Sequence, residues 1–185
     1  MIFLYFLTSI FILYTVVFIA VIFKISIIIK KTKLNYYFDE EFMLLIKPYI
    51  QNRNFISLKE NGHHNGISVY NHLLAIAYLT YKIKDKKNKK DAVIGALLHD
   101  YYLYNWHLRE RRHRFHSLRH PHIALKNARN DFELSKKSKD IILKHMFPVT
   151  FYLVPKYIDT WLVSFIDKYV SSLEFLNTTF IKIAK

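Results

Sequence analysis

The stretch that decides the fold is DAVIGALLHD, residues 91–100. Its apolar residues run without a polar break to Leu98, and His99 and Asp100 follow directly. Such a run predicts a buried helix, here from about Asp91 to Leu103. An imidazole and a carboxylate at the end of a buried helix need partners, because uncompensated polar groups are costly in a core. The stretch therefore predicts a helical core with a polar site at one end.

Three further polar side chains interrupt apolar helix faces in the same way. They are His72 in a helix that begins near Ser68, His145 one turn after Ile141, and Asp167 between Val163 and Val170. Taken singly, an inward histidine is most often a hydrogen-bonded core residue. Four such positions on four helices instead predict a common metal site inside a helical bundle. Imidazole and carboxylate together suit divalent transition metal ions such as Mn, Fe, Co or Zn.

The rest of the chain from Asn35 onward is also typical of helices. Apolar residues recur at helical spacing from Phe38 to Tyr49, a polar loop follows at 51–66, and a lysine-rich turn spans 82–90. Pro121 fits the first turn of a fourth helix, Ser135 caps a fifth, and Pro155 opens the last. No useful alternation of apolar and polar residues indicates a strand. We therefore predict an all-α fold.

The N-terminal segment has a different composition. Residues 2–23 form a run of 22 residues without a charge, and a helix of that length spans roughly 33 Å, enough to cross a bilayer. Lysines follow at positions 24, 30, 31 and 33, which places residues 34–185 in the cytoplasm. We expect a single-pass transmembrane anchor in contact with the lipid bilayer at 1–31, a linker at 32–61, a catalytic domain at 62–175 and a tail at 176–185.

Composition excludes several classes of function. The 185-residue chain has no cysteine, so disulfides, thiolate metal sites and cysteine nucleophiles are excluded. Its three glycines, at 62, 66 and 95, cannot form a dinucleotide-binding fingerprint or a Walker loop. The net charge of +14 alone supports nucleic-acid binding only weakly, and we expect no nucleic-acid partner.

The polar residues also stand in a familiar order. His72, then His99-Asp100, then Asp167 resembles the H…HD…D signature of the HD-domain metal-dependent phosphohydrolases. The flanking stretches SVYNH, residues 68–72, and ALLHD, residues 96–100, are similar to that family's ligand-bearing helices. His120-Pro121 and His145 resemble the extra histidines of the subfamilies that bind two metal ions. The resemblance covers roughly residues 60–175.

The resemblance implies an HD-like helical bundle that hydrolyses a phosphate ester, with a nucleotide as the favoured substrate class. It implies that His72, His99, Asp100 and Asp167 hold one divalent metal ion, and that Asp100 bridges to a second ion completed by His120 and His145. His99 and Asp100 would be the catalytic residues. Two such ions activate a water that attacks phosphorus, so no protein nucleophile is required.

The sequence also departs from the family. Met146-Phe147-Pro148 follows His145 in place of a Gly-Tyr-Pro signature, and Tyr101 and Tyr102 stand where a lysine is often found. The general acid is therefore unassigned. His116 and His122 compete with His120 as ligands, and a site with a single metal ion is an alternative. A non-catalytic HD-like module that binds a nucleotide or a protein is the alternative function.

A basic segment lies between the HD pair and His120. It holds five of the seven arginines, and guanidinium groups bind phosphate bidentately. We expect a phosphorylated small-molecule substrate to contact Arg111, Arg112, Arg114, Arg119 and the loop residue His64. Tyr104, Trp106 and His107 could stack on a base. The alternative is a solvated loop, or one that lies on anionic lipid headgroups.

Overall fold

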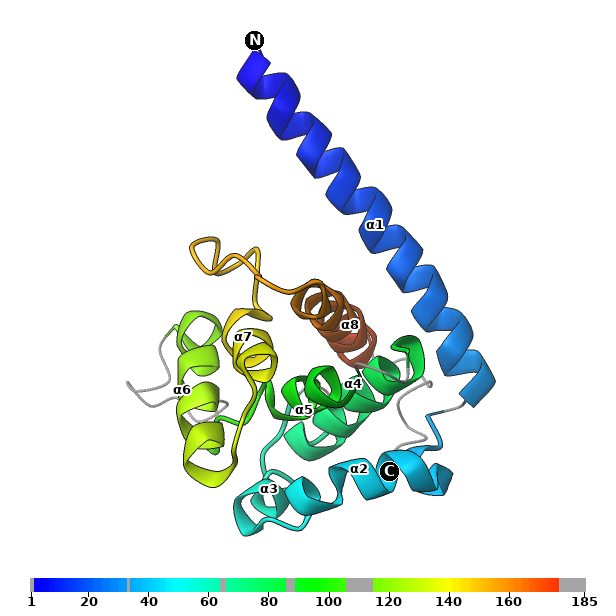
Figure 1. Cartoon of the computed structure of the whole chain (residues 1–185), viewed down its shortest axis with the longest axis vertical. Helices are drawn as coiled ribbons and strands as arrows, with labels where there is room; N and C mark the ends of the chain where they lie inside the picture. Colours follow the sequence, from blue (N-terminus) through cyan, green and yellow to red (C-terminus); the bar gives the residue numbers. More distant parts are fainter. Residues whose placement is uncertain (1, 33, 64–65, 86–88, 106–114, 177–185) are drawn as a thin grey trace.

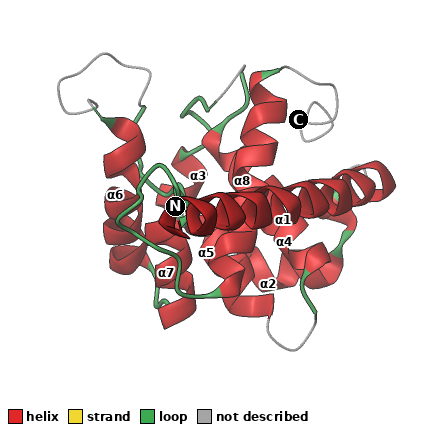
Figure 2. Cartoon of the chain, turned by 90° about the horizontal axis from the view of Figure 1, so that it is seen from above, coloured by secondary structure: helices red, strands yellow, loops and turns green. Residues whose placement is uncertain are grey.

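The computed structural model describes residues 2–32, 34–63, 66–85, 89–105 and 115–176. Every regular element in these ranges is a helix, as Figures 1 and 2 show. The helices are α1 (Ile2–Thr32), the 3₁₀ helix η1 (Tyr36–Phe38), α2 (Glu40–Ile50), α3 (Arg53–Ser57), α4 (Val69–Ile83), α5 (Lys89–Leu98), α6 (His116–Asp131), α7 (Lys136–Lys144) and α8 (Ile158–Phe175). The prediction of an all-α fold is confirmed.

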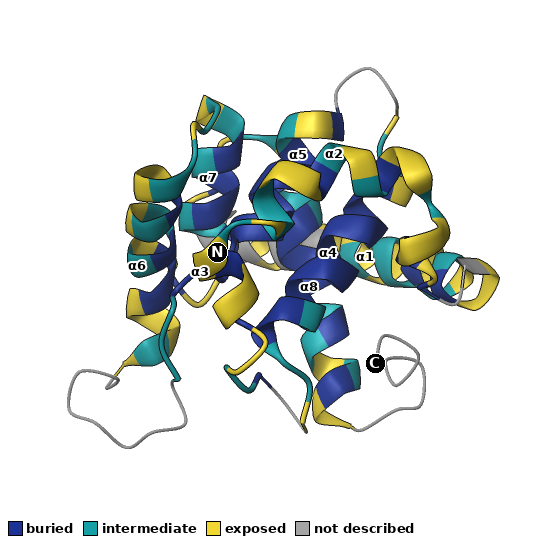
Figure 3. Cartoon of the chain, turned by 90° about the horizontal axis from the view of Figure 1, so that it is seen from below, coloured by how far each residue is buried: buried dark blue, intermediate teal, exposed yellow. Residues whose placement is uncertain are grey.

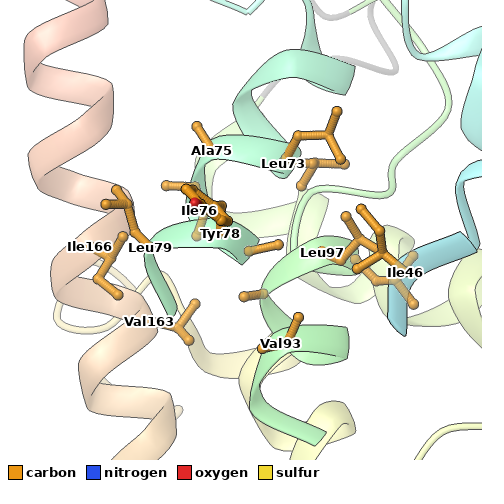
Figure 4. Packing of buried hydrophobic residues seen from close by; sticks show 14 of the residues in the cluster. Ile46, Leu73, Ala75, Ile76, Tyr78, Leu79, Val93, Leu97, Val163 and Ile166 are labelled. Atoms are coloured by element: carbon orange, nitrogen blue, oxygen red, sulfur yellow. The ribbon is translucent and has the colours of Figure 1, made fainter. Parts of the chain in front are cut away.

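Helices α4 and α5 form the centre of the molecule, and α7 and α8 pack against them (Figure 3). Both central helices are apolar along almost their whole length, so they are buried on nearly all sides. Figure 4 shows Leu79 of α4 beside Ile166 of α8 in this core. Gly95 lets α5 approach α7 closely, because a Cβ atom there would lie 2.8 Å from the Cδ1 atom of Ile141.

The predicted cap at Ser135 is present, and Ser68, near which a helix was predicted to begin, is a cap as well. The hydroxyl of Ser68 accepts the backbone N–H of Asn71 at the start of α4, at 3.2 Å. The hydroxyl of Ser135 accepts the backbone N–H of Ser138 at the start of α7, at 3.1 Å. Each cap satisfies a donor that the first turn leaves unpaired. These caps fix where the helices that carry His72 and His145 begin.

Other boundaries differ from the prediction. The expected loop at 51–66 contains α3, whose cap is Asn52; its side chain accepts the N–H of Asn54 at 2.8 Å. Helix α5 ends at Leu98 rather than Leu103, because His99 and Asp100 leave the helix in a turn. Pro121 lies in the second turn of α6, because that helix begins at His116.

The prediction that the N-terminal segment crosses a membrane is wrong. None of the described helices is both long and apolar enough to span a bilayer, so the single-pass localisation is wrong as well. The C-terminal part of α1 instead packs against α8 and α4, and its first turns project away from the other helices (Figure 1). Ile25 is fully buried, and the hydroxyls of Ser26 and Tyr169 are hydrogen-bonded at 2.6 Å. These side chains therefore pack against the rest of the chain.

Candidate metal centre

The six predicted ligands converge in one buried cluster. His72 comes from α4, the His99-Asp100 pair from the turn after α5, His120 from α6, His145 from the C-terminal end of α7, and Asp167 from α8. None of the six residues is more than 6% exposed. Five helices end or cross at this point, so His72 and Asp167 meet although 95 positions separate them in the chain.

Three of the imidazoles are held by a carbonyl one turn earlier in the chain. The Nδ1 atoms of His99, His120 and His145 lie 2.8, 2.9 and 2.9 Å from the carbonyl oxygens of Ala96, His116 and Ile142, respectively. A carbonyl only accepts hydrogen bonds, so each Nδ1 carries the proton and donates it. Each Nε2 atom is therefore the ring nitrogen that can act as a ligand.

His72 is held differently. Its Nδ1 atom donates to the Oε1 atom of Glu174 at 2.9 Å, and its Nε2 atom lies 3.3 Å from the Oδ1 atom of Asp167. The Nε2 atom of His99 lies 3.5 Å from the same oxygen. His72, His99 and Asp167 thus form one group of facing donor atoms.

A second group surrounds Asp100. Its Oδ1 atom lies 3.1 Å from Nε2 of His120 and 3.4 Å from Nε2 of His145. These two Nε2 atoms are 3.0 Å apart. The Oδ2 atom of Asp100 lies 3.7 Å from Nε2 of His99, so this carboxylate also reaches the first group.

The donor atoms of the cluster fit a metal ion. His72, His99 and Asp167 each present a ligand atom within 4.8 Å of the other two, and so do His99, Asp100 and His145. The buried Nε2 atoms of His72 and His99 and the Oδ1 atom of Asp100 have no hydrogen-bond partner among the described residues. Orphaned buried polar atoms are rare in native proteins. These buried His and Asp groups could hold a metal ion.

The charges within the cluster are tightly coupled. Burial favours the neutral form of Asp167, but the facing imidazoles of His72 and His99 outweigh it and hold the pKa of this carboxyl well below its usual range. Burial disfavours the charged form of His72, but Glu174 and Asp167 outweigh it and raise the pKa of its imidazole. Burial lowers the pKa of His145 to about 4. The carboxylates are therefore ionised at neutral pH.

A cavity of about 440 Å³ opens beside the cluster. Asp100, Asp167 and His120 contribute to its wall. The rest of the wall consists of a histidine before α4, polar side chains of α8 and α6, and two apolar side chains after α7: His63, Lys168, Ser171, Ser172, His116, Ser117, Met146 and Val149. A cavity of this size and mixed polarity can take a small polar ligand next to the six predicted residues.

The competing histidines are also placed. His122 is exposed on α6, whereas His120 points into the cluster. His116 lines the cavity, stacks on the ring of His120 at 4.7 Å and is hydrogen-bonded through Nδ1 to the hydroxyl of Tyr104 at 2.9 Å. Of these three histidines, His120 is therefore the one whose Nε2 faces Asp100.

The predicted substrate-binding residues are not brought together in the described part of the chain. Arg119 is exposed on α6 and does not line the cavity. His64, Arg111, Arg112 and Arg114 lie outside the described residues, as do Trp106 and His107. The expected contacts of these residues with a phosphorylated substrate remain predictions.

Three residues at the site are missing from the sequence-based prediction. His63 and Lys168 line the cavity, and Glu174 holds His72. A signal for Glu174 is present in the sequence, since it lies two turns after Asp167 on the same face of α8. His63 lies in a polar loop without periodicity, which gives no comparable signal.

Comparisons of this chain with protein-family models, curated proteins and solved structures give no match. The features of this chain that bear on its function are therefore those of the cluster itself. What the structure establishes is an all-helical chain with buried His and Asp groups that could bind a metal ion.

Proposed function

We propose that this chain is a metal-dependent phosphohydrolase of the HD-domain type that acts on a small phosphate ester, with a nucleotide as the favoured class. One observation carries the proposal: the H…HD…D residues and the two extra histidines meet in one buried cluster. Their order along the chain and their meeting in space are independent requirements. A chance resemblance in sequence would not require five helices to converge on the same residues.

The residues divide into two sets that suit two divalent metal ions. His72, His99 and Asp167 would hold one ion, and His120 and His145 the other, with Asp100 between them. Bound there, such ions polarise a phosphoryl oxygen and lower the pKa of a bound water. The protein contributes by fixing each Nε2 through a hydrogen bond at Nδ1, so the ligands need no reorganisation.

The cavity supports a small anionic substrate. Lys168 supplies a positive charge in its wall, and its Nζ atom is fixed by the carbonyl of His145 at 2.9 Å and the hydroxyl of Ser164 at 2.7 Å. The hydroxyl of Ser117 can donate to a phosphate oxygen. The hydroxyls of Ser171 and Ser172 donate to Asp167 Oδ1 and to the carbonyl of Lys168, and their oxygens can accept from a sugar hydroxyl. The volume of about 440 Å³ is at the lower end of ligand pockets, which run from ~300 to ~1,000 Å³.

The test begins with metal analysis of the purified full chain. The protein, loaded in turn with Mn, Fe, Co or Zn, is then assayed with phosphomonoesters, phosphodiesters and nucleotides for release of phosphate or nucleoside. We expect bound metal and hydrolysis of at least one class. Metal binding without any hydrolysis would overturn the enzyme assignment in favour of a binding module, and absence of metal binding would overturn both.

A matched pair of variants on α6 tests the site. His120→Ala removes a buried ligand, whereas His122→Ala removes an exposed histidine two residues away on the same helix. We expect His120→Ala to lower both metal content and turnover, and His122→Ala to leave both unchanged. Equal activity in the two variants would remove His120 from the proposed site.

A further inference from the structure

Glu174 is a buried carboxylate outside the six predicted ligands. It lies in the last turns of α8 and is 1% exposed. Its Oε1 atom accepts the Nδ1 proton of His72 at 2.9 Å, and its Oε2 atom accepts the Nδ1 proton of His63 at 2.6 Å. One carboxylate therefore holds two imidazoles, one on each oxygen.

The two imidazoles lie face to face. Their ring centroids are 3.9 Å apart with an interplanar angle of 25°. The backbone of His63 is held near the start of α4, because its N–H donates to the carbonyl of Ile67 at 2.7 Å. Stacked rings held by the same carboxylate direct their opposite nitrogens to the same side.

These Nε2 atoms face the buried cluster of the six predicted ligands. The Nε2 atom of His63 lies 3.8 Å from the Oδ2 atom of Asp100, and that of His72 lies 3.3 Å from the Oδ1 atom of Asp167. His63, His72 and Asp100 each present a ligand atom within 4.8 Å of the other two. All three residues are buried, and His63 also lines the cavity.

An ionised carboxylate can only accept hydrogen bonds. Each oxygen of Glu174 lies within hydrogen-bond distance of one Nδ1 atom, at 2.9 Å from His72 and 2.6 Å from His63. Both imidazoles must then carry a proton at Nδ1. The arrangement fixes the nitrogen that each ring offers to a metal ion, which is the role outer carboxylates have at His-ligated metals.

We propose that Glu174 is a positioning residue that aims His72 and His63 at the metal centre, and that His63 is a further nitrogen ligand beside Asp100. The inference depends on the metal site of the proposed function but not on hydrolysis. It adds a seventh ligand that the H…HD…D pattern does not contain.

The first experiment measures Zn²⁺ affinity of the full chain by competition with a chromophoric chelator. Glu174→Gln keeps the shape of the side chain but replaces one acceptor oxygen by an amide that donates, so one Nδ1–H loses its partner. We expect the affinity to fall by about 10–100-fold, the usual effect of losing an outer-shell partner. Glu174→Asp keeps the acceptor-only carboxylate and should retain part of the affinity. Glu133→Gln, which neutralises an exposed carboxylate, is the control and should bind as the wild type does.

A second experiment needs no variant and remains valid if Glu174→Gln fails to fold. Histidine-selective ¹⁵N NMR of the wild-type chain reports the protonation of each ring nitrogen. We expect His63 and His72 to carry the proton at Nδ1, and the Nε2 signals of both to shift when Zn²⁺ is added. A His63 signal that does not change with Zn²⁺, or unchanged affinity in a folded Glu174→Gln variant, would overturn the inference.

These results are separable from those that test hydrolysis. Weaker Zn²⁺ binding by Glu174→Gln in a protein that hydrolyses no phosphate ester would sustain the inference while the enzyme assignment fails. Hydrolysis that persists with unchanged metal affinity in Glu174→Gln would sustain the enzyme while the inference fails.

Discussion

Two groups of buried carboxylates lie in this chain, and their charges are balanced by different means. Asp140 and Asp159, here called the lysine-paired carboxylates, are 8% and 3% exposed. Asp159 forms ion pairs with Lys84 at 2.6 Å and Lys137 at 2.8 Å. Asp140 pairs with Lys144 at 2.6 Å and accepts hydrogen bonds from Thr160 and the backbone of Lys156.

Asp100 and Asp167 are equally buried, each at 6%, but face imidazoles instead of lysines. A lysine paired with a carboxylate is cationic at neutral pH, whereas imidazole binds either a proton or a metal ion. The charges of the lysine-paired carboxylates are therefore balanced by lysines of the chain, and these contacts hold α4, α7 and α8 together. The cluster around Asp100 leaves buried ring nitrogens without hydrogen-bond partners, as a binding site does.

The largest expected effect is that of Asp100→Asn. The amide keeps the size of the side chain but removes the charge between the two groups of ligands. We expect kcat/KM with the best phosphate ester to fall on the order of 10³-fold, together with loss of bound metal. Steady-state kinetics and metal analysis measure the two effects. Asp159→Asn, which changes a lysine-paired carboxylate, should leave both nearly intact, and equal losses in the two variants would contradict the distinction.

Metal addition should stabilise the protein through the cluster only. A ligand present at 100 times its Kd adds about 2.7 kcal/mol to the free energy of unfolding. For a chain of this size that corresponds to a rise in Tm of roughly 5–10 °C. Differential scanning calorimetry of the wild type with Zn²⁺ and with EDTA measures the difference. Asp100→Asn should lose the rise and Asp159→Asn should keep it; a rise retained by Asp100→Asn would place the metal elsewhere.

Asp159→Asn should instead reduce stability. The substitution leaves Lys84 and Lys137 without their shared anion, although both lysines are partly exposed and can turn to water. We expect the free energy of unfolding to fall by about 1–3 kcal/mol, less than for a fully buried pair. Urea unfolding followed by circular dichroism measures it. An unchanged midpoint would show that this contact contributes nothing.

The ion pairs of Asp159 also predict that the free energy of unfolding depends on pH in the acid range. This dependence should be no larger than the loss expected for Asp159→Asn. Burial favours the neutral form of Asp159, but Lys137 and Lys84 outweigh it and lower its pKa below the ordinary value. A depressed pKa stabilises the fold at pH above the unfolded value, about 3.9, and the contribution disappears as the pH falls through the folded value. The difference in urea midpoint between wild type and Asp159→Asn should therefore shrink below about pH 4. A difference that stays constant down to pH 2 would rule out the ion pairs as its cause.

The buried cluster of His and Asp residues was largely predictable from the sequence, because most of its members follow helical periodicity. His72, His145 and Asp167 each replace an apolar residue on a helix face, so their inward direction follows from helical spacing. Helical spacing could also have identified Glu174, which lies two turns after Asp167 on α8. It could not have identified His63, the ring that stacks on His72. The position of a loop residue depends on tertiary contacts, which helical spacing does not describe.

The N-terminal segment shows the opposite case. Hydropathy counts the apolar residues of a helix but does not identify what they contact. Ile25 and Ser26 of α1 contact the helical body, and the ring of Phe18 lies 5.4 Å from that of Phe165 in α8. The interface between α1 and α8 joins residues more than 140 positions apart, and no local pattern in α1 encodes its partner.

The smallest expected effect distinguishes the two carboxylates within the lysine-paired group. Lys144→Ala removes the partly exposed lysine that pairs with Asp140 one turn earlier in α7, but Asp140 keeps its hydrogen bonds from Thr160 and the backbone of Lys156. Because an i,i+4 pair of this kind contributes little, we expect a loss of only about 0.5 kcal/mol in urea unfolding. Lys136→Ala, which removes an exposed lysine from the first turn of the same helix, is the control and should cause no loss. A loss from Lys144→Ala as large as that from Asp159→Asn would mean that Asp140 depends on its lysine as fully as Asp159 does, and that its other hydrogen bonds do not compensate its charge.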